Sequence, residues 1–262
     1  MNPTETTTIH PTAIIDPGAQ LGAGVTVEPY AVIDDNVEIG DGSVIGSHTR
    51  IASGARLGRG VKVHHGAVLG TVPQDLKFGG EETLLTVGDN TVIRECATLN
   101  RGTRARGRTV VGSDCLIMAY AHVAHDCILG DHVILANAVQ LGGHVTIGEW
   151  AILGGAVVVH QFSLVGAHCM IGGGFRVTQD VPPYAVVGGY PARVLTVNHI
   201  GLERRGFSAE QIAALTRAFR TLFRSGLNRT QAMDKLKSEG AHTAEVEHLI
   251  EFFAQSERGV MR

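Results

Sequence analysis

Aliphatic residues recur at every sixth position along most of the chain. The repeat runs without a break from Ile9 to Leu69, resumes from Val87 to Leu99, and runs again from Val111 to Val177. An α-helix repeats at about 3.6 residues and a strand at about two, so neither produces a sustained period of six. A fixed hexapeptide repeat instead predicts a solenoid of parallel β-strands.

Three hexapeptides complete one triangular turn of such a solenoid, so residues 18 apart are expected to stack on neighbouring coils. We therefore predict an all-β, left-handed parallel β-helix over residues 1–188, an exception to the usual right-handed crossover. Two stretches, at about 71–86 and 101–109, interrupt the repeat but preserve its phase. They are predicted to be loops extruded from corners of the coil, where a rigid scaffold often presents functional groups.

The six-residue pattern ends near Pro182-Pro183, because proline cannot donate to a β-ladder. We expect a helical domain over residues 189–262 that also caps the last coil. Ser208 and Gln211 form a candidate capping box at the start of its main helix. Helices are predicted from Ser208 to a stop at Ser225-Gly226, over Gln231–Ser238 and over Ala244–Ser256.

Composition is consistent with a narrow coil and excludes several classes of protein. The 262 residues are 44% hydrophobic and 5% aromatic and include 34 glycines. A net charge of −3 gives no reason to expect a nucleic-acid partner. No apolar stretch approaches the roughly 20 residues of a membrane span, and the N-terminus lacks signal-peptide order, so we expect a cytoplasmic protein without a transmembrane segment. Three cysteines occupy inward positions and are interpreted as core filler: Cys115, Cys127 and Cys169.

The stacking rule brings polar residues together at one corner. Asp126 follows His125 and is suited to orient its imidazole and raise its basicity. A backbone N–H at Gly143 could approach a developing oxyanion, since glycine has no side chain. The residues predicted to gather here are His122, His125, Gly143, His144, His160 and Gln161. Other histidines are interpreted as surface or edge residues: His10, His48, His132 and His168.

Two other interpretations of this corner stay open on these residues. It could be a solvated polar ladder on a non-catalytic hexapeptide scaffold. It could also hold a metal, because three imidazoles suffice for catalytic zinc. The γ-class carbonic anhydrases hold metal on the same coil, but their histidine pair five residues apart has no counterpart in this cluster. No nucleophile motif is present, so we favour a histidine general base and expect neither a metal nor another cofactor.

Eight motifs occur in an order that resembles the UDP-N-acetylglucosamine O-acyltransferases, cytoplasmic enzymes that open lipid A synthesis in Gram-negative bacteria. They are HPTAIIDPGAQLG, QDLKFGGE, NRGT, AHVAHDCILG, LGGHVTIG, VHQFSLVGAH, QDVPPYAVVGGYPA and GLERRGFS. The resemblance implies transfer of an R-3-hydroxyacyl group from acyl carrier protein to the 3-hydroxyl of the UDP-sugar. It also implies a homotrimer with active sites between subunits. A related N-acyltransferase carries an extra N-terminal domain, for which the repeat beginning at Ile9 leaves no room.

The resemblance also assigns roles to individual residues. His125 would be the general base, Asp126 its orienting partner and Gly143 the oxyanion donor. Sugar and phosphate contacts are implied for Asp75 and Lys77, which could otherwise be an exposed ion pair. The sugar and acyl groove would be lined by His122, His144, His160 and Gln161. Nucleotide contacts are implied for Asn198, Arg204 and Arg205, the arginines being otherwise a solvated charge pair.

Two residues differ from what the family motif or the hexapeptide repeat leads us to expect. Two glycines, in addition, are implied to determine the length of the acyl chain. Asn100 stands where many members of the family have histidine, and Phe175 is large for its inward position and predicts a distortion or an end of the coil. Gly155 and Gly173 are expected to stack and to leave the acyl channel open for a long chain.

Arginines follow helical spacing in the predicted main helix, at Arg217, Arg220 and Arg224. Acyl carrier proteins are acidic, so this basic stripe is a candidate docking surface for the donor. A solubilising face is the alternative.

Overall fold

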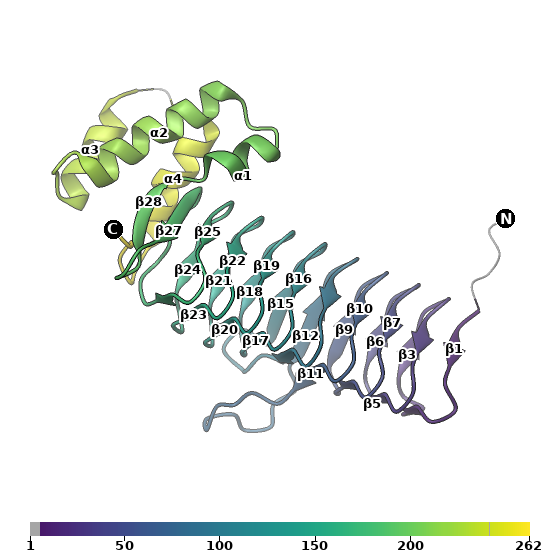
Figure 1. Ribbon diagram of the computed structural model, residues 1–262. Helices are drawn as coiled ribbons and strands as arrows, with labels where there is room; N and C mark the ends of the chain where they lie inside the picture. Colours follow the sequence, from purple (N-terminus) through teal and green to yellow (C-terminus); the bar gives the residue numbers. More distant parts are fainter. Residues whose placement is uncertain (1–5, 241) are drawn as a thin grey trace.

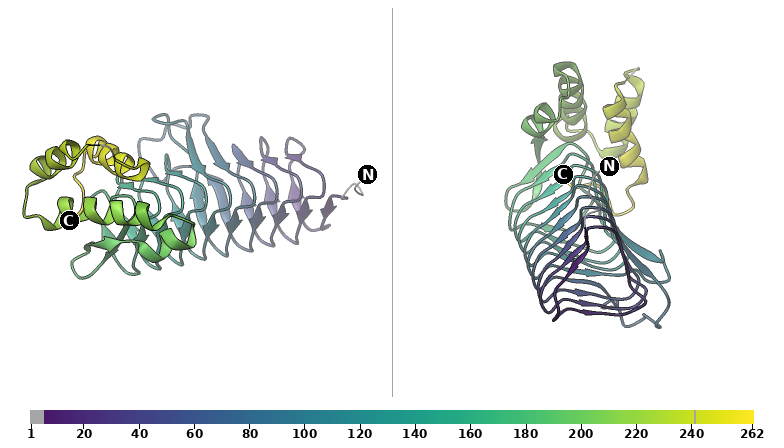
Figure 2. Two further views of the ribbon diagram at one scale, coloured as in Figure 1. Left: turned by 90° about the horizontal axis from the view of Figure 1, so that it is seen from above. Right: turned by 90° about the vertical axis from the view of Figure 1, so that its right-hand side faces the viewer.

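Residues 6–240 and 242–262 are described by the structure, a computed structural model. Within them, short strands wind into a long coil that ends at a group of helices (Figure 1). The strands form three sheets, one on each side of the coil (Figure 2). The predicted left-handed parallel β-helix followed by a helical region is confirmed.

The first sheet contains, in order, β1 (Thr8–Ile9), β4 (Thr26–Val27), β7 (Val44–Ile45), β10 (Lys62–Val63), β13 (Val92–Ile93), β16 (Leu116–Ile117), β19 (Ile134–Leu135), β22 (Ile152–Leu153), β25 (Met170–Ile171), β27 (Ala185–Gly188) and β28 (Arg193–Val197). The second contains β2 (Ile14–Ile15), β5 (Val32–Ile33), β8 (Arg50–Ile51), β11 (Val68–Thr71), β14 (Thr98–Asn100), β17 (His122–Val123), β20 (Gln140–Leu141), β23 (Val158–Val159) and β26 (Arg176–Val177). The third contains β24 (Leu164–Val165), β21 (Thr146–Ile147), β18 (Ile128–Leu129), β15 (Arg108–Val111), β12 (Leu84–Val87), β9 (Ala55–Leu57), β6 (Glu38–Ile39) and β3 (Gln20–Leu21).

Pairing follows the predicted step of 18 residues, as where His122 lies opposite Gln140. The step lengthens where the repeat is interrupted, so that Lys62 pairs with Val92 and Val92 with Leu116. Two extra segments, loop 72–83 and loop 101–107, leave the coil between β11 and β12 and between β14 and β15. Their flanking residues extend the strands, so the loops are shorter than the stretches in which the sequence repeat is broken.

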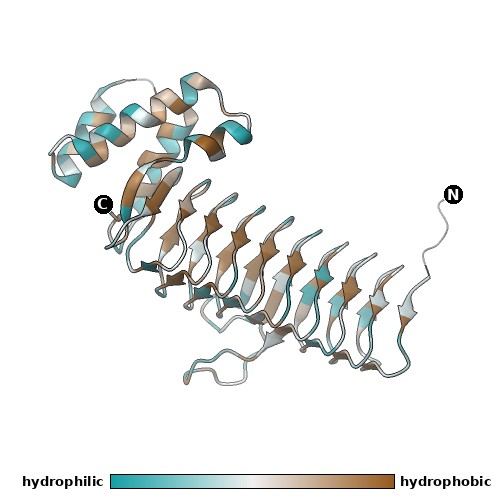
Figure 3. Cartoon of the chain, viewed as in Figure 1, coloured by the Kyte–Doolittle hydropathy of each residue, from teal (hydrophilic) through white to brown (hydrophobic). Residues whose placement is uncertain are grey.

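The aliphatic residues of the repeat form the core of the coil (Figure 3). Ile33, Ile45 and Leu69 are 0–1% exposed. Full burial of one such side chain contributes about 1.5–3 kcal/mol to folding. Ile9, in the first coil, has a neighbouring coil on one side and is 48% exposed.

Corners of the coil are tight turns whose last residue has a positive φ. At the corner that carries the polar cluster, this residue is Asp126 (φ 60°), His144 (φ 63°) or Phe162 (φ 63°) on three successive coils. Non-glycine residues adopt this conformation infrequently. Its repetition here projects successive side chains from one edge of the prism.

The coil ends near Phe175, in agreement with its size. The ring lies against Gly172, where a Cβ would come within 2.7 Å of the Phe175 Cε2 atom. β26, which begins at the next residue, is the last strand of its sheet. β27 and β28 then pair antiparallel in the first sheet.

Four helices follow: α1 (His199–Arg204), α2 (Ala209–Arg224), α3 (Arg229–Ser238) and α4 (Ala244–Gln255). The predicted capping box of Ser208 and Gln211 is present at α2, and Gly226 follows the helix with a positive φ. α2 packs against β28 and the other helices. The sequence did not predict α1. Among the described residues, no helix combines the length and apolar character that crossing a bilayer would need.

Candidate active site

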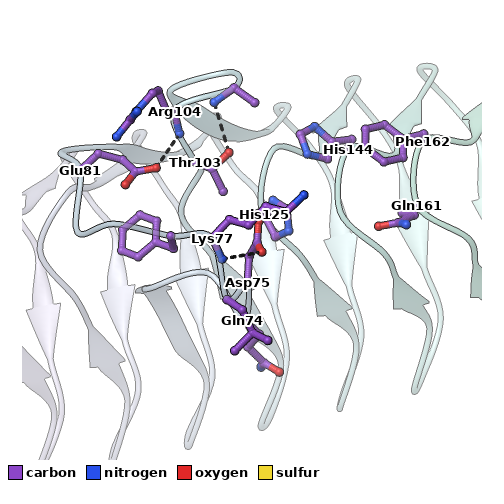
Figure 4. Close-up of a pocket in the computed structure, with 13 residues that line it drawn as sticks. Gln74, Asp75, Lys77, Glu81, Thr103, Arg104, His125, His144, Gln161 and Phe162 are labelled. Atoms are coloured by element: carbon purple, nitrogen blue, oxygen red, sulfur yellow. Dashed lines mark hydrogen bonds between the residues drawn. The ribbon is translucent and has the colours of Figure 1, made fainter.

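A cleft of about 770 Å³ opens where the two loops overhang the polar corner (Figure 4). One wall comes from the coil and the other from loop 72–83 and loop 101–107. Its lining residues are Gln74, Asp75, Leu76, Lys77, Phe78, Glu81, Thr103, Arg104, Ala105, His125, His144, Gln161 and Phe162.

His125 faces this cleft and is held from behind by Asp126. Its Nδ1 atom lies 2.8 Å from Asp126 Oδ2. Because an ionised carboxylate only accepts hydrogen bonds, Nδ1 carries the proton and Nε2 keeps a free lone pair. An imidazole in this state can accept a proton from a substrate hydroxyl.

Asp126 is fully buried, yet its surroundings favour the carboxylate. Burial alone would raise its pKa. The hydrogen bonds from the Thr103 hydroxyl, at 2.6 Å, the Thr103 N–H, at 3.0 Å, and His125 outweigh burial and hold the pKa of Asp126 below its ordinary value. The pair therefore combines a fixed negative charge with an oriented imidazole.

His144 completes the corner one coil further along. Its ring meets that of His125 edge to face, with centroids 5.2 Å apart, and its Nε2 lies 3.6 Å from Asp126 Oδ2. Burial lowers the pKa of His144, and the Asp126 carboxylate opposes that effect. His144 is therefore suited to contact a bound substrate as a neutral imidazole.

Gly143 lies directly under the His125 ring. A Cβ at this position would come within 2.7 Å of both Cε1 and Nε2 of His125. Within residues 6–240 and 242–262, the Gly143 N–H donates no hydrogen bond. Gly143 thus leaves room for the imidazole and offers a free donor, 18 residues after His125 and 18 before Gln161.

Loop 72–83 brings Asp75 and Lys77 to the cleft (Figure 4). Asp75 Oδ1 accepts from the Lys77 N–H at 3.0 Å, which shapes the turn and leaves the ammonium group exposed. Glu81 joins the two loops by accepting from the Arg104 N–H at 3.0 Å and the Gly79 N–H at 2.8 Å. Its own backbone hydrogen bond and these two lower the pKa of Glu81.

His122 and His160 do not line the cleft in this chain. The Nδ1 of His122 lies 2.7 Å from Thr98 Oγ1, and burial lowers its pKa. The Nδ1 of His160 lies 2.9 Å from the Gln161 carbonyl oxygen. Both side chains are partly exposed on the coil.

The residues implied for the nucleotide lie at the start of the helices. Asn198 caps α1 by accepting from the Gly201 N–H at 3.2 Å and donates to the His168 carbonyl at 2.9 Å. Arg205 lies over the Trp150 ring, 5.2 Å from its centroid, and donates to the Trp150 carbonyl. Arg204 is exposed.

The interpretation of His168 as a surface or edge residue is wrong. It is 8% exposed, lies parallel to Tyr184 and meets Phe207 edge to face. Burial, with the charge of Arg205 and then His248, lowers its pKa to about 4. The helical region covers this corner, which the repeat alone does not predict.

The two glycines implied for acyl-chain selectivity are stacked. A Cβ on Gly173 would lie 3.1 Å from the Gly155 carbonyl oxygen. Gly173 is exposed and Gly155 partly exposed, so the surface is free of side chains at this point.

Asn100 is 3% exposed and lies at the base of loop 72–83. Its amide donates to Thr71 Oγ1 at 3.0 Å and to the Val72 carbonyl at 3.3 Å. In this chain the amide is therefore used to hold the loop.

Among the residues that the structure describes, His125, Asp126 and His144 form one group whose ligand atoms lie within 4.8 Å of one another. The donor set does not suit a metal, because Asp126 Oδ2 already accepts from the Thr103 hydroxyl and from His125. A metal would have to displace at least one of these hydrogen bonds to reach the buried carboxylate.

Several residues of the cleft were not predicted from the sequence. Phe162 follows Gln161 and is 52% exposed, and Arg104 and Glu81 connect the loops. Thr103 lies in the NRGT motif and Glu81 in the QDLKFGGE motif, so these two motifs could have identified them as site residues. Phe162 could have been found by adding 18 to His144.

Family models match both the coil and the helical region of the chain. A family model described as UDP-N-acetylglucosamine O-acyltransferase, domain 2, matches residues 180–261. A model described as bacterial transferase hexapeptide matches residues 18–53, 36–71 and 108–143.

Similar proteins cover almost the whole chain. The acyl-[acyl-carrier-protein]–UDP-N-acetylglucosamine O-acyltransferase of Chlorobium phaeobacteroides is 58% identical over 253 residues, which is 96% of each chain. The Thiobacillus denitrificans protein of the same name is 48% identical, covering 97% of this chain and 99% of that one. The crystal structure of the UDP-N-acetylglucosamine acyltransferase from Bacteroides fragilis has a TM-score of 0.93 at 44% identity, covering 97% and 99%.

Proposed function

The chain belongs to the UDP-N-acetylglucosamine O-acyltransferases, and we propose that it moves an R-3-hydroxyacyl group from acyl carrier protein to the glucosamine 3-hydroxyl of UDP-N-acetylglucosamine. This reaction opens lipid A synthesis. The observation that carries the proposed mechanism is the 2.8 Å contact between His125 Nδ1 and Asp126 Oδ2 beside a cleft.

His125 is the general base in this mechanism. Its Nε2 takes the proton of the sugar 3-hydroxyl as the oxygen attacks the thioester carbonyl. The negative charge that develops on the carbonyl oxygen is stabilised by the free Gly143 N–H. Collapse of this intermediate expels the thiolate of the acyl carrier, and the imidazolium returns the proton to it. Asp126 stabilises the imidazolium between these steps.

The remaining residues hold the substrates. Lys77 and Asp75, on loop 72–83, contact the phosphate and the sugar, and His144 and Gln161 line the groove. Gly155 and Gly173 leave space for a long acyl chain. Arg217, Arg220 and Arg224 on α2 receive the acidic acyl carrier protein, and all three are exposed.

We further propose that the enzyme works as a homotrimer in the cytoplasm. Asn198, Arg204 and Arg205, assigned to the nucleotide, lie near α1, whereas loop 72–83 projects from the other side of the coil (Figure 1). His122 and His160 lie outside the cleft of their own chain. A site between subunits would bring these groups to the cleft of a neighbour.

Acyl transfer measured by mass spectrometry tests this function. His125→Ala is expected to lower kcat by about 100- to 10,000-fold, the usual contribution of a general base. His48→Ala is the matched control, because His48 is exposed on a distant coil and stacks on Tyr30. Equal turnover by the wild type and His125→Ala would overturn the mechanism.

A chelator arm separates this mechanism from the metal-dependent alternative. Turnover is expected to be unchanged after exhaustive treatment with chelator. Loss of activity that added Zn²⁺ restores would favour the metal enzyme. Absence of acyl transfer by the wild type under all conditions would favour a scaffold.

A further inference from the structure

The carboxylate of Asp126 accepts four hydrogen bonds, and three of them come from loop 101–107. Oδ1 accepts from the backbone N–H of Thr103 at 3.0 Å and of Arg106 at 3.2 Å. Oδ2 accepts from Thr103 Oγ1 at 2.6 Å and from His125 Nδ1 at 2.8 Å. A buried carboxylate needs such donors to stay charged. The loop therefore supplies most of what keeps Asp126 ionised.

The NRGT motif builds this arrangement residue by residue. Arg101 anchors the loop by donating to the Ser53 carbonyl at 3.0 Å. Gly102 passes so close to the backbone of Arg108 that an added Cβ would collide with it. These contacts place Thr103, which is 8% exposed, directly over the Asp126 carboxylate.

The direction of the Thr103 hydroxyl is fixed by its second partner. The Ala105 N–H donates to Thr103 Oγ1 at 3.2 Å, so the hydroxyl hydrogen is directed to Asp126. With Thr103 and Arg106 holding three of the four positions, the carboxylate presents one remaining acceptor site to His125. That site selects the imidazole tautomer with the proton on Nδ1.

We propose that Thr103 is a positioning residue of the reaction: its hydroxyl and N–H orient Asp126, which in turn sets the tautomer of His125. This inference rests on the proposed role of His125 as general base. The hydroxyl and the N–H of Thr103 both end on Asp126, and Asp126 in turn contacts His125. Thr103 therefore acts on His125 only through the orientation and charge of the Asp126 carboxylate.

The tautomer can be observed without substrate by ¹⁵N NMR of histidine-labelled protein, with His125 assigned by the loss of its signals in His125→Gln. The wild type and Thr103→Ser are expected to show His125 protonated on Nδ1. Thr103→Val, which keeps the shape but lacks the hydroxyl, is expected to show a mixture with the Nε2-protonated form. The same tautomer in Thr103→Val as in the wild type would overturn the inference.

Kinetics provides a second, independent readout. Thr103→Val is expected to lower kcat about 10- to 100-fold, the range seen for the hydrogen-bond partners of metal-binding histidines. The Michaelis constant for UDP-N-acetylglucosamine is expected to stay within about twofold, and Thr103→Ser should restore most of kcat. If Thr103→Val does not fold, Thr103→Cys answers the same question, because a thiol is a weak donor.

Thr91→Val is the matched control. Thr91 is fully buried and its hydroxyl donates to the Gly112 carbonyl at 2.8 Å, in a coil turn without contact to Asp126. It should lower thermal stability and leave the kcat of the folded enzyme unchanged. An equal fall of kcat in Thr91→Val and Thr103→Val would overturn the inference. Full activity in His125→Ala would instead defeat the proposed general-base role of His125, and absence of acyl transfer by the wild type would defeat the proposed function. The NMR result would still report on Thr103 in both cases.

Discussion

The imidazole of His144 lies face to face with the phenyl ring of Phe162, with 4.4 Å between their centroids and 9° between their planes. The pair forms a continuous wall on two successive coils of the cleft. Because both residues have a positive φ, the turn conformation itself aligns the rings.

Phe162→Ala is expected to uncover His144 and raise its lowered pKa toward the ordinary value. An aromatic pair stabilises the arrangement of its two rings by about 0.5–1.5 kcal/mol. Without it the His144 ring must be ordered when substrate binds, so kcat/KM should fall by up to about tenfold. Histidine NMR titration and initial rates measure the two effects. Tyr30→Ala removes a comparable stack, on His48 in a distant turn, and should change neither.

Gly143→Ala is expected to lower kcat by at least about 100-fold, because the new Cβ would displace the His125 ring and crowd the oxyanion donor. Steady-state rates with a melting curve separate this effect from loss of fold. Gly18→Ala is the control, since its Cβ would meet the Asp16 side chain at 3.3 Å and Asp35 at 3.5 Å, far from the cleft. Wild-type turnover in Gly143→Ala would refute the placement of His125.

His168 predicts a pH dependence of stability. Its pKa is lowered to about 4 in the folded protein, from an ordinary 6.5, so the unfolded chain binds the extra proton between these values. Stability from this group is present above pH 6.5 and is lost as the pH falls toward 4, on the order of 3 kcal/mol in total. Melting temperatures should fall less steeply over this window in His168→Gln than in the wild type. His48→Gln, at an exposed site, should keep the wild-type slope.

Charge reversal at Arg220 and Arg224 tests the docking surface on α2. The double glutamate variant is expected to raise the Michaelis constant for the acyl carrier about tenfold or more. The dependence of this Michaelis constant on salt concentration should become weaker. The Michaelis constant for the UDP-sugar should not change. Reversal of Lys235 and Lys237, exposed on α3, makes the same change in net charge and is the matched control. Equal effects of both double variants would remove the proposal.

Gly173→Met tests the acyl-chain ruler. Its side chain is expected to block the surface left open by Gly173 and Gly155 and to shorten the preferred donor by several carbons. Gly173→Ala should shorten it less, since a single methyl group fits after a small shift from the Gly155 carbonyl. Competition among donors of different length, followed by mass spectrometry, measures the preference. An unchanged profile in both variants would contradict the assignment.

The hexapeptide period predicted the coil and the stacking of His125 on Gly143, because a solenoid converts sequence spacing directly into distance. Ser208 and Gln211 likewise marked the start of α2 through local hydrogen bonding. Contacts that leave the repeat could not be found this way. Thr103 reaches Asp126 from an inserted loop to which the step of 18 does not apply.

Burial by distant segments was also outside the reach of the repeat. His168 occupies a corner position like that of His48, and it is buried because Phe207 and Tyr184 cover it. α1 is short, and its cap, Asn198, is tied to the carbonyl of residue 168 on the coil. Such elements depend on tertiary contacts more than on local sequence preference.

The two loops leave the coil at its edges and return in register, so the inward residues before and after them face the same core. Their length is thereby uncoupled from the packing that stabilises the protein. Chemistry at this corner can be altered by lengthening, shortening or exchanging a loop while every buried aliphatic residue keeps its neighbours. The coil is a constant support on which the loops can be exchanged, so the substrate contacts at one edge can be redesigned without altering the core.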